Sequence, residues 1–376
     1  MKKRLLSLTL CLLLALSGLT ACGKSGEPEA ESTLDNIFTT PTTEAASQPT
    51  EPDSQATDPS SPESPDPFFG GITHGFSDET LNNEKGRYNI YEGGEMHIDY
   101  FMDVSGTVAK DGVGLLVVLD GQPQPYKTAE EDTYSYLHTF YPTPGKRLDI
   151  EMIMTPVTGQ EGDTLELTVF HLLGPDYYSN PNEMAPGMRQ TVGSTFGSTQ
   201  LVFQATPPKA ELPDTPERVA AQSVEYPDLT SGELASWTAE ALQTDSSYAF
   251  ATNYNWNSGY IFGVSPEENL TIRSEVFGST AVEWSYILYV NHQPVSVLPE
   301  NQVMFHTQNG KKTVIETTLD MSGFDGEGII YAMFYARNWR DWPSLNFTAH
   351  PVFSSTHYLT DAENLQAMQE KYDEKQ

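Results

Sequence analysis

The sequence predicts an all-β fold: two tandem antiparallel β-sandwiches with a short inter-domain helix and a C-terminal helix. Three observations predict it. Apolar and polar residues alternate over short segments that are separated by Gly, Pro and Asp. No helical pattern lies between these segments, which favours antiparallel sheets over a parallel one. The same succession of segments then recurs further along the chain, which indicates a duplicated domain.

The N-terminus has the pattern of a secretory signal. Three basic residues at positions 2–4 precede an apolar stretch, residues 5–16, that is shorter than the roughly 20 residues a membrane-spanning helix needs. The residues Leu19-Thr20-Ala21-Cys22 that follow resemble the lipobox of bacterial lipoproteins. The resemblance implies cleavage before Cys22 and a diacylglycerol thioether on its sulfur, so that the chain is held at a membrane, facing outside the cytoplasm.

The sequence contains two cysteines, Cys11 and Cys22. Cys11 lies within the apolar stretch and would leave with it. We therefore expect a mature chain without a disulfide, whose domains depend on their cores alone. Stable anchoring through Cys22 takes more than one acyl chain.

Residues 23–67 are rich in Pro, Ser, Thr and Glu and contain ten acidic residues against Lys24. Such a segment has too few large apolar residues to offset the entropy of ordering, so it is predicted to be a disordered tether. As a flexible coil it would place the globular part about 35–40 Å from the membrane.

The whole chain has 52 acidic residues against 20 basic ones, a net charge of -32. This charge repels nucleic-acid backbones, so nucleic acid is excluded as a partner. Solubility outside the cell is one account of the charge. A cationic partner and divalent-cation binding are the others.

The alternation is clearest in residues 95–104. Every second side chain there is apolar, and these share one face of an extended strand: Met96, Ile98, Tyr100, Met102 and Val104. Further strands are expected at residues 113–120, 148–154 and 164–173.

Four pairs of segments carry the repeat, and they keep their order along the chain. The pairs are 114–126 with 285–297, 138–154 with 303–319, Leu165, Leu167 and Val169 with Ile329, Tyr331 and Met333, and 201–206 with 351–356. Preserved order over four segments predicts that the second sandwich repeats the first.

Two helices are predicted from capping boxes, in which Thr precedes Glu by three residues. Thr230 and Glu233 begin the first, and its apolar residues share one face: Leu234, Trp237, Ala241 and Leu242. Thr360 and Glu363 begin the second, with these residues on one side: Leu365, Met368 and Tyr372. Both helices are expected to pack on the sandwiches or on the junction between them.

The predicted organisation has six parts. They are a signal peptide (1–21), the lipidated cysteine with its tether (22–67), a first sandwich (68–207), a linker with a short helix (208–245), a second sandwich (246–357) and a C-terminal helix (358–376). The globular part resembles tandem immunoglobulin-like domains, and its motifs point to no specific family.

No motif predicts catalysis, and we expect no catalytic residue, no cofactor and no metal ligand. The eight histidines stand singly, and none lies in a metal-binding spacing. His97 and His171 lie within strands and are expected to be solvated or hydrogen-bonded. The segment GSTFGST (193–199) lacks the Gly-x-Ser-x-Gly pattern of a nucleophile turn, and DGEG (325–328) falls short of a calcium loop.

The candidate binding surface consists of aromatic and polar side chains in loops. Two long loops follow equivalent strands, and a third cluster precedes the first repeated strand of the second sandwich. Their candidate residues are Tyr177, Tyr178, Trp256, Trp339, Arg340 and Trp342. Such rings suit sugar stacking or a protein interface. The alternative is that they close the ends of the sandwich cores.

The expected function is non-catalytic binding or adhesion at the cell envelope, by a lipoprotein anchored through Cys22, with an envelope protein as partner. The alternative is carbohydrate binding, for example to cell-wall glycan, through the aromatic loops. An enzyme is less expected. A transporter's solute-binding protein is disfavoured because its alternating strand–helix lobes have no counterpart in this sequence.

Overall fold

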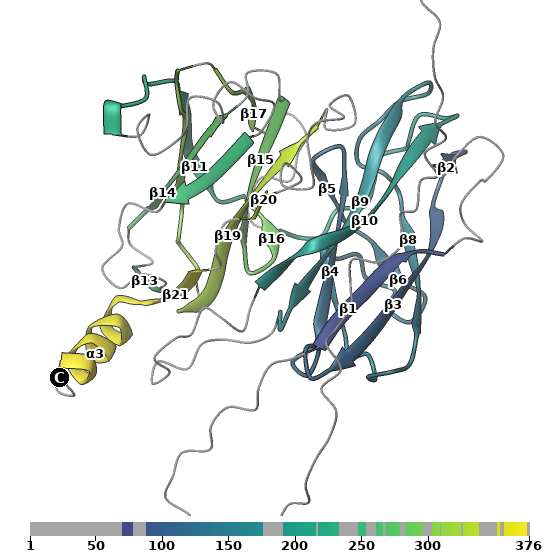
Figure 1. Cartoon of the computed structure of the whole chain (residues 1–376), viewed down its shortest axis with the longest axis horizontal. Helices are drawn as coiled ribbons and strands as arrows, with labels where there is room; N and C mark the ends of the chain where they lie inside the picture. The colour runs from purple at the N-terminus through teal and green to yellow at the C-terminus, as the bar shows by residue number, and fades with distance from the viewer. Residues whose placement is uncertain are drawn as a thin grey trace, which may run out of the picture. The chain divides into compact units, whose positions relative to one another are not determined.

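The computed structural model describes residues 70–77, 88–175, 191–215, 217–232, 247–252, 261–265, 268–278, 283–295, 303–308, 310–324, 326–337, 352–353 and 357–373. The predicted signal peptide, Cys22, the tether and all but the first residues of the inter-domain helix lie outside these ranges. Strands make up most of the described part of the chain, and turns, loops and one C-terminal helix make up the rest (Figure 1). Among the described residues, no helix has the length and apolar character needed to cross a membrane.

Residues 70–203, called the first half below, form two sheets. Their strands are β1 (Gly70–Phe76), β2 (Tyr88–Tyr91), β3 (Met96–Gly106), β4 (Val113–Leu119), β5 (Gln122–Gln124), β6 (Lys127–Thr128), β7 (Leu137–Phe140), β8 (Leu148–Met154), β9 (Thr164–Leu173) and β10 (Thr191–Phe203). One sheet has the order β1-β3-β8-β6, and the other has the order β2-β10-β9-β4-β5 with β7 also paired to β4.

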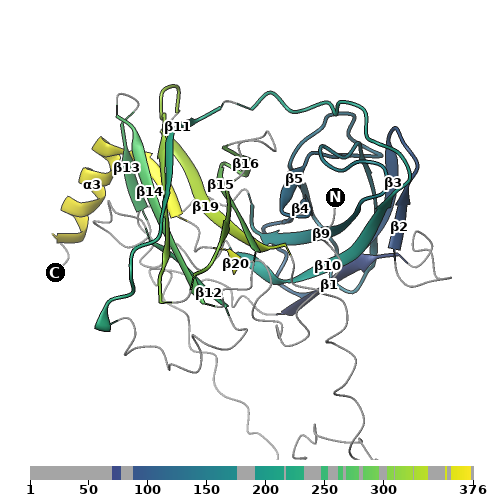
Figure 2. The same cartoon turned by 90° about the horizontal axis from the view of Figure 1, so that it is seen from above.

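The core of the first half lies between these two sheets. It contains the alternate residues predicted for β3, from Ile98 to Val104, and the alternate residues of β8, from Ile150 to Met154. The strands predicted at 95–104, 113–120, 148–154 and 164–173 are therefore confirmed, with ends shifted by at most two residues. Seen along their length, the strands of this half curve around their core (Figure 2).

Residues 219–361, the second half, also form two sheets. Their strands are β11 (Val219–Glu225), β12 (Ser247–Thr252), β13 (Ile261–Val264), β14 (Leu270–Gly278), β15 (Glu283–Val290), β16 (Gln293–Pro294), β17 (Val303–His306), β18 (Thr313–Leu319), β19 (Glu327–Ala336), β20 (Val352–Phe353) and β21 (His357–Asp361). One sheet has the order β11-β18-β14-β12, and the other has β13-β21-β19-β15-β16 with β17 on β15 and β20 on β19.

Not every strand pair is antiparallel, and this departs from the predicted architecture. β2 runs parallel to β10, and β13 runs parallel to β21. In the first half, β1 lies in one sheet and β2 in the other, so the chain crosses between sheets near its start. Parallel pairing is possible because the two partners are far apart in the sequence, which leaves a long connection between them.

The strand pairing allows the two halves to be compared residue by residue. Asp120 and Gly121 form a two-residue hairpin between β4 and β5, and Asn291 and His292 form one between β15 and β16. All four residues have positive φ, 48° and 82° in the first hairpin and 49° and 62° in the second. This is the geometry of a type I′ turn, so these hairpins occupy equivalent positions.

From this hairpin the equivalence extends into β9 and β19, where it corrects the predicted alignment. Leu119 pairs with Leu167, and Val290 pairs with Ile330. Leu167 therefore corresponds to Ile330, not to Tyr331. The predicted alignment was wrong by one residue, and in a strand such a shift exchanges the two faces.

The alignment of 201–206 with 351–356 is also wrong. Phe353 pairs with Met333 on β19. In the first half the equivalent pair is Phe196 with Phe170 on β9. Phe353 therefore corresponds to Phe196 and not to Phe203.

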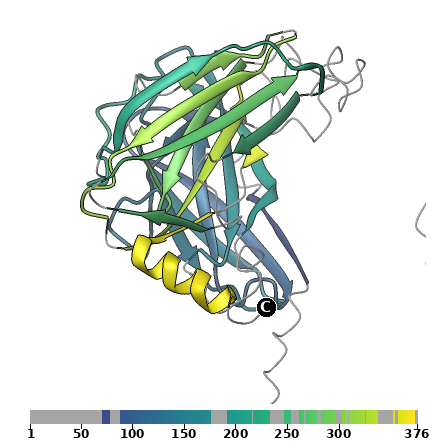
Figure 3. The same ribbon diagram turned by 90° about the vertical axis from the view of Figure 1, so that its left-hand side faces the viewer.

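A helix, α3 (Ala362–Asp373), follows β21 directly and contacts β13 and β21 (Figure 3). Asp361 caps it, because its carboxylate accepts a hydrogen bond of 2.7 Å from the amide of Asn364. The cap is thus one residue later than the Thr360 predicted from the capping box.

Candidate functional site

The central strands of the two halves are buried on both faces. In β4, β9, β15 and β19 nearly every residue is inaccessible to solvent. Alternate residues, such as Val117 in β4, point into the core of their own half. The intervening residues form a third apolar cluster that joins the halves, called the seam here: Leu116, Val118, Phe170, Ile287, Tyr289, Ile329, Tyr331, Met333, Tyr335 and Tyr358.

Aromatic rings make up much of the seam. Tyr289 and Tyr331 stack with their centroids 5.0 Å apart and their planes 12° from parallel. The hydroxyl of Tyr335 lies 3.2 Å from the Thr168 hydroxyl of the first half. Burial raises the pKa of both Tyr289 and Tyr331 above the ordinary phenol value, so the seam contains neutral phenols at physiological pH.

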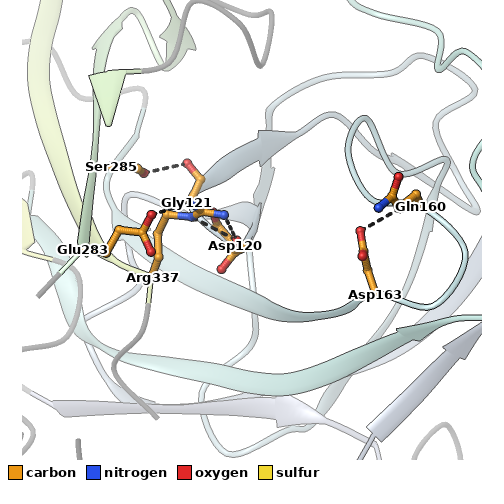
Figure 4. Close-up of polar contacts among 7 residues, drawn as sticks. All are labelled: Asp120, Gly121, Gln160, Asp163, Glu283, Ser285 and Arg337. Atoms are coloured by element: carbon orange, nitrogen blue, oxygen red, sulfur yellow. Dashed lines mark hydrogen bonds and ion pairs between the residues drawn. The ribbon is translucent and has the colours of Figure 1, made fainter. Parts of the chain in front are cut away.

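At one end of the seam, an ion pair crosses between the halves. Arg337, directly after β19, donates from Nε to Oδ2 of Asp120 at 3.0 Å and also from Nη2 to the same oxygen. Its Nε also faces the Asp120 carbonyl oxygen at 3.2 Å, and its Nη1 donates to Glu283 at 3.2 Å. Figure 4 shows Arg337 between these two carboxylates. One guanidinium thus holds a turn of the first half against β15 and β19.

The carboxyl of Asp120 is in an unfavourable place for a charge. Its side chain is only 15% exposed, against 30% for Arg337. Burial raises the pKa of Asp120, and the positive charge of Arg337 partly opposes that rise. Glu283 and Asp163 add a smaller upward contribution to the pKa. Arg337 is therefore the group that allows Asp120 to ionise here.

Gly121, the next residue in the turn, allows the two halves to approach closely. A Cβ at this position would overlap the side chain of Ser285 and lie 3.2 Å from Cδ1 of Tyr335. The hydroxyl of Ser285 donates a hydrogen bond of 3.2 Å to the Gly121 carbonyl (Figure 4). Glycine is thus required both by the positive φ and by the neighbouring half.

We expect Gly121→Ala to lower the free energy of unfolding more than Gly145→Ala. Both glycines have similar positive φ, 82° and 75°, so both substitutions should cost about 1–2 kcal/mol of backbone strain. Around Gly145, however, a Cβ would find no atom within 4 Å, whereas at Gly121 it would meet Ser285. Overpacking should add about 1–3 kcal/mol for Gly121 alone. Urea unfolding of both variants measures the difference, and equal losses would contradict close packing at the seam.

At the other end of the seam, the second half reaches back to the first. Nε2 of His292, in the hairpin of the second half, lies 2.8 Å from the carbonyl oxygen of Pro175, just beyond β9. Nδ1 of the same ring lies 3.3 Å from the Tyr331 hydroxyl. Because the carbonyl can only accept, Nε2 carries the proton in this contact.

The residues predicted to bind a ligand lie outside the described part of the chain. They are Tyr177, Tyr178, Trp256, Trp339, Arg340 and Trp342, and Cys22 lies outside it as well. The structure does describe the residues from which the two long loops start, Pro175 and Arg337. Pro175 contacts His292 beside Tyr331. Arg337 lies six positions after Tyr331, just beyond the end of β19, which is about 20 Å at roughly 3.3 Å per residue. The loops therefore start from opposite ends of the seam.

Histidines within the first half have structural contacts. His74 Nε2 lies 2.8 Å from Nδ1 of His171, and His74 Nδ1 lies 2.6 Å from the Tyr100 hydroxyl. His138 is buried between Glu131, at 2.6 Å, and the Tyr126 carbonyl, at 2.7 Å. These contacts are all within the first half and fit the expectation that strand histidines are hydrogen-bonded.

His97 is exposed on the outer face of β3 and lies 2.7 Å from Glu151. Among the described residues, no group of three or more His, Cys, Asp or Glu side chains is placed to hold a metal ion.

The seam residues were not identified from sequence, although a signal was present. Continuous apolar runs such as residues 113–119 and 328–336 indicate strands buried on both faces. The positive φ of His292 is a second unusual feature of the seam, but it is visible only in the structure, because a sequence does not show backbone angles.

Comparison with known proteins identifies no family. No family model matches the chain, and no curated protein matches its sequence. Among solved structures, the C-terminal domain of the AgI/II polypeptide BspA of Streptococcus agalactiae is 9% identical, with a TM-score of 0.19 over 77% of this chain and 100% of that one. The fibronectin(III)-like modules of CbhA from Clostridium thermocellum are 9% identical, with a TM-score of 0.16 over 78% and 96%.

A chimeric titin Z1Z2 tandem is also 9% identical, with a TM-score of 0.16 over 72% of this chain and 93% of that one. At these TM-scores none of the superpositions carries an argument about fold or function, so both rest on the residues of this chain.

Proposed function

We propose that this chain is an exported lipoprotein, anchored to the outside of the cell membrane through Cys22, in which two tandem immunoglobulin-like sandwiches form a non-catalytic binding or adhesion module. The N-terminal sequence supports the anchor and the acidic tether. The binding role is supported mainly by the seam. Asp120, Arg337 and His292 join the two halves through polar contacts, so that a binding module would have one continuous body to present its loops.

The anchor is tested by labelling cells that express the full-length chain with a clickable palmitate analogue. We expect label on the wild-type protein and none on Cys22→Ala, because only that sulfur can form the thioether. Cys11→Ala is the matched control and should keep its label, since Cys11 lies in the segment that is removed. Labelled Cys22→Ala protein, or loss of label in Cys11→Ala, would overturn the anchor.

The binding role is tested with the purified mature chain on arrays of polysaccharides and of surface proteins from the parent cell. Tyr178→Ala and Trp342→Ala are assayed separately, because their loops start from opposite ends of the seam. An envelope protein that binds wild type with micromolar or better affinity supports the proposal. Absence of any partner on both arrays would count against it.

Carbohydrate binding is the second candidate, supported by the aromatic residues flanked by Asn, Asp and Arg in these loops. Glycan binding that is lost in either loop variant would establish it and identify the loop. Protein binding that survives both substitutions would place the site elsewhere on the sandwiches.

A further inference from the structure

The two halves use the same surface to form the seam. In the register of β4 with β9 and of β15 with β19, three pairs of equivalent residues all lie in this cluster: Leu116 with Ile287, Val118 with Tyr289, and Phe170 with Met333. The two members of each pair occupy equivalent positions of equivalent strands, and each lies against the other half. Such use of one patch by both partners defines an isologous interface, the kind made by two copies of one protein.

The contacts at the two ends are reciprocal in the same sense. The hairpin of the first half, at Asp120, contacts the residue after β19, Arg337. The hairpin of the second half, at His292, contacts a residue just after β9, Pro175. An approximate two-fold axis through the seam would exchange these two sets of contacts.

The chemistry at the two ends nevertheless differs. Where the first half has Asp120 and Gly121, the second has Asn291 and His292. Where the second half has Ser285 and Arg337, the first has Gly114 and Gly174 at the equivalent strand positions.

We propose that the seam is an isologous interface between related sandwiches and that Asp120, Gly121 and Arg337 select the unlike half as the partner. Two first halves would place Asp120 beside Gly174, with no cation for the buried carboxylate. Two second halves would place His292, the equivalent of Gly121, over Ser285. In the actual structure a single Cβ added at Gly121 would already overlap the Ser285 side chain, so a histidine would not fit. Only the unlike pair satisfies both the charge and the volume, which is specificity by exclusion of the alternatives.

The test uses the full mature chain with a protease site inserted after the exposed Lys209, in the connection between β10 and β11. The chain is cut after folding and examined by native mass spectrometry at micromolar concentration, where the different masses of the halves distinguish all pairs. We expect only pairs of unlike halves. Separation of the halves on cutting, or like pairs as abundant as unlike ones, would overturn the proposal.

Substitutions then exchange residues between equivalent positions. D120N/G121H gives the first hairpin the residues of the second, and the histidine should no longer fit over Ser285. We expect the halves to bind roughly 100-fold more weakly, as is common when a central contact is removed. Adding S285G, the residue at the equivalent position of the first half, should restore affinity to within tenfold. Failure of S285G to restore binding would refute selection by volume.

Finally, R337G added to these three substitutions makes the two ends alike. Like pairs should then appear beside unlike pairs after cutting, because neither charge nor volume distinguishes them. Exclusive unlike pairing in this variant would show that other residues select the partner and would overturn the assignment. Far-UV circular dichroism of each uncut variant checks that it remains folded.

Discussion

Phe170→Ala is expected to lower the free energy of unfolding by about 3–5 kcal/mol, the usual range when a buried phenylalanine is truncated and its cavity cannot collapse. Phe170 is 1% exposed and lies in the seam, where side chains from both halves surround it. The two rigid sheets limit how far the site can close around the smaller residue. Urea unfolding of the mature chain measures the loss.

Tyr141→Ala is the matched control, because it also removes a large aromatic ring from the first half. Tyr141 is 68% exposed, so its loss should change the free energy of unfolding by no more than about 0.5 kcal/mol. A loss below about 1 kcal/mol for Phe170→Ala would mean that the seam contributes little to stability.

Arg337→Met should destabilise the chain by about 2–3 kcal/mol at pH 7, because it leaves a buried carboxylate without its cation. The loss should be smaller at pH 4. Burial already raises the pKa of Asp120, and without Arg337 nothing of comparable strength opposes that rise.

The sign follows from the linkage between protonation and folding. A carboxyl group whose pKa is higher in the folded than in the unfolded state contributes stability below the unfolded pKa. That contribution is lost as pH rises through the folded value. The deficit of Arg337→Met should therefore grow from about pH 4 upward, as the unfolded chain begins to release the proton that the folded chain retains.

The double variant Asp120→Asn/Arg337→Met provides the control for this pH dependence. Asn is neutral, similar in size to Asp and suited to positive φ, as the equivalent Asn291 shows. We expect the double variant to be more stable than Arg337→Met at pH 7 and to lose the added pH dependence. A deficit that is constant from pH 4 to pH 7 would contradict the role assigned to Arg337.

Local sequence identified four strands of the first half, β3, β4, β8 and β9. In β3 the period of two assigned each side chain to a face correctly, because a half-exposed strand has one polar and one apolar side. The repeat was visible where turn chemistry constrains it, as in the Gln-Pro pairs that follow the equivalent hairpins, Gln122 with Pro123 and Gln293 with Pro294. The alignment failed in β9 and β19, where nearly all residues are apolar and no alternation marks the faces.

The sequence by itself determined the charge, the N-terminal pattern, the alternating strands and the order in which they recur, because each depends on residues close together in the chain. Only the tertiary structure decided that Asp120 meets Arg337, 217 positions away, and that the two halves bury a common face. Long-range pairing depends on how whole sheets pack, and side chains of one composition can cover a core or an interface equally well. The apolar runs of β4 and β19 required a second partner, but only packing could show that this partner was the other half of the same chain.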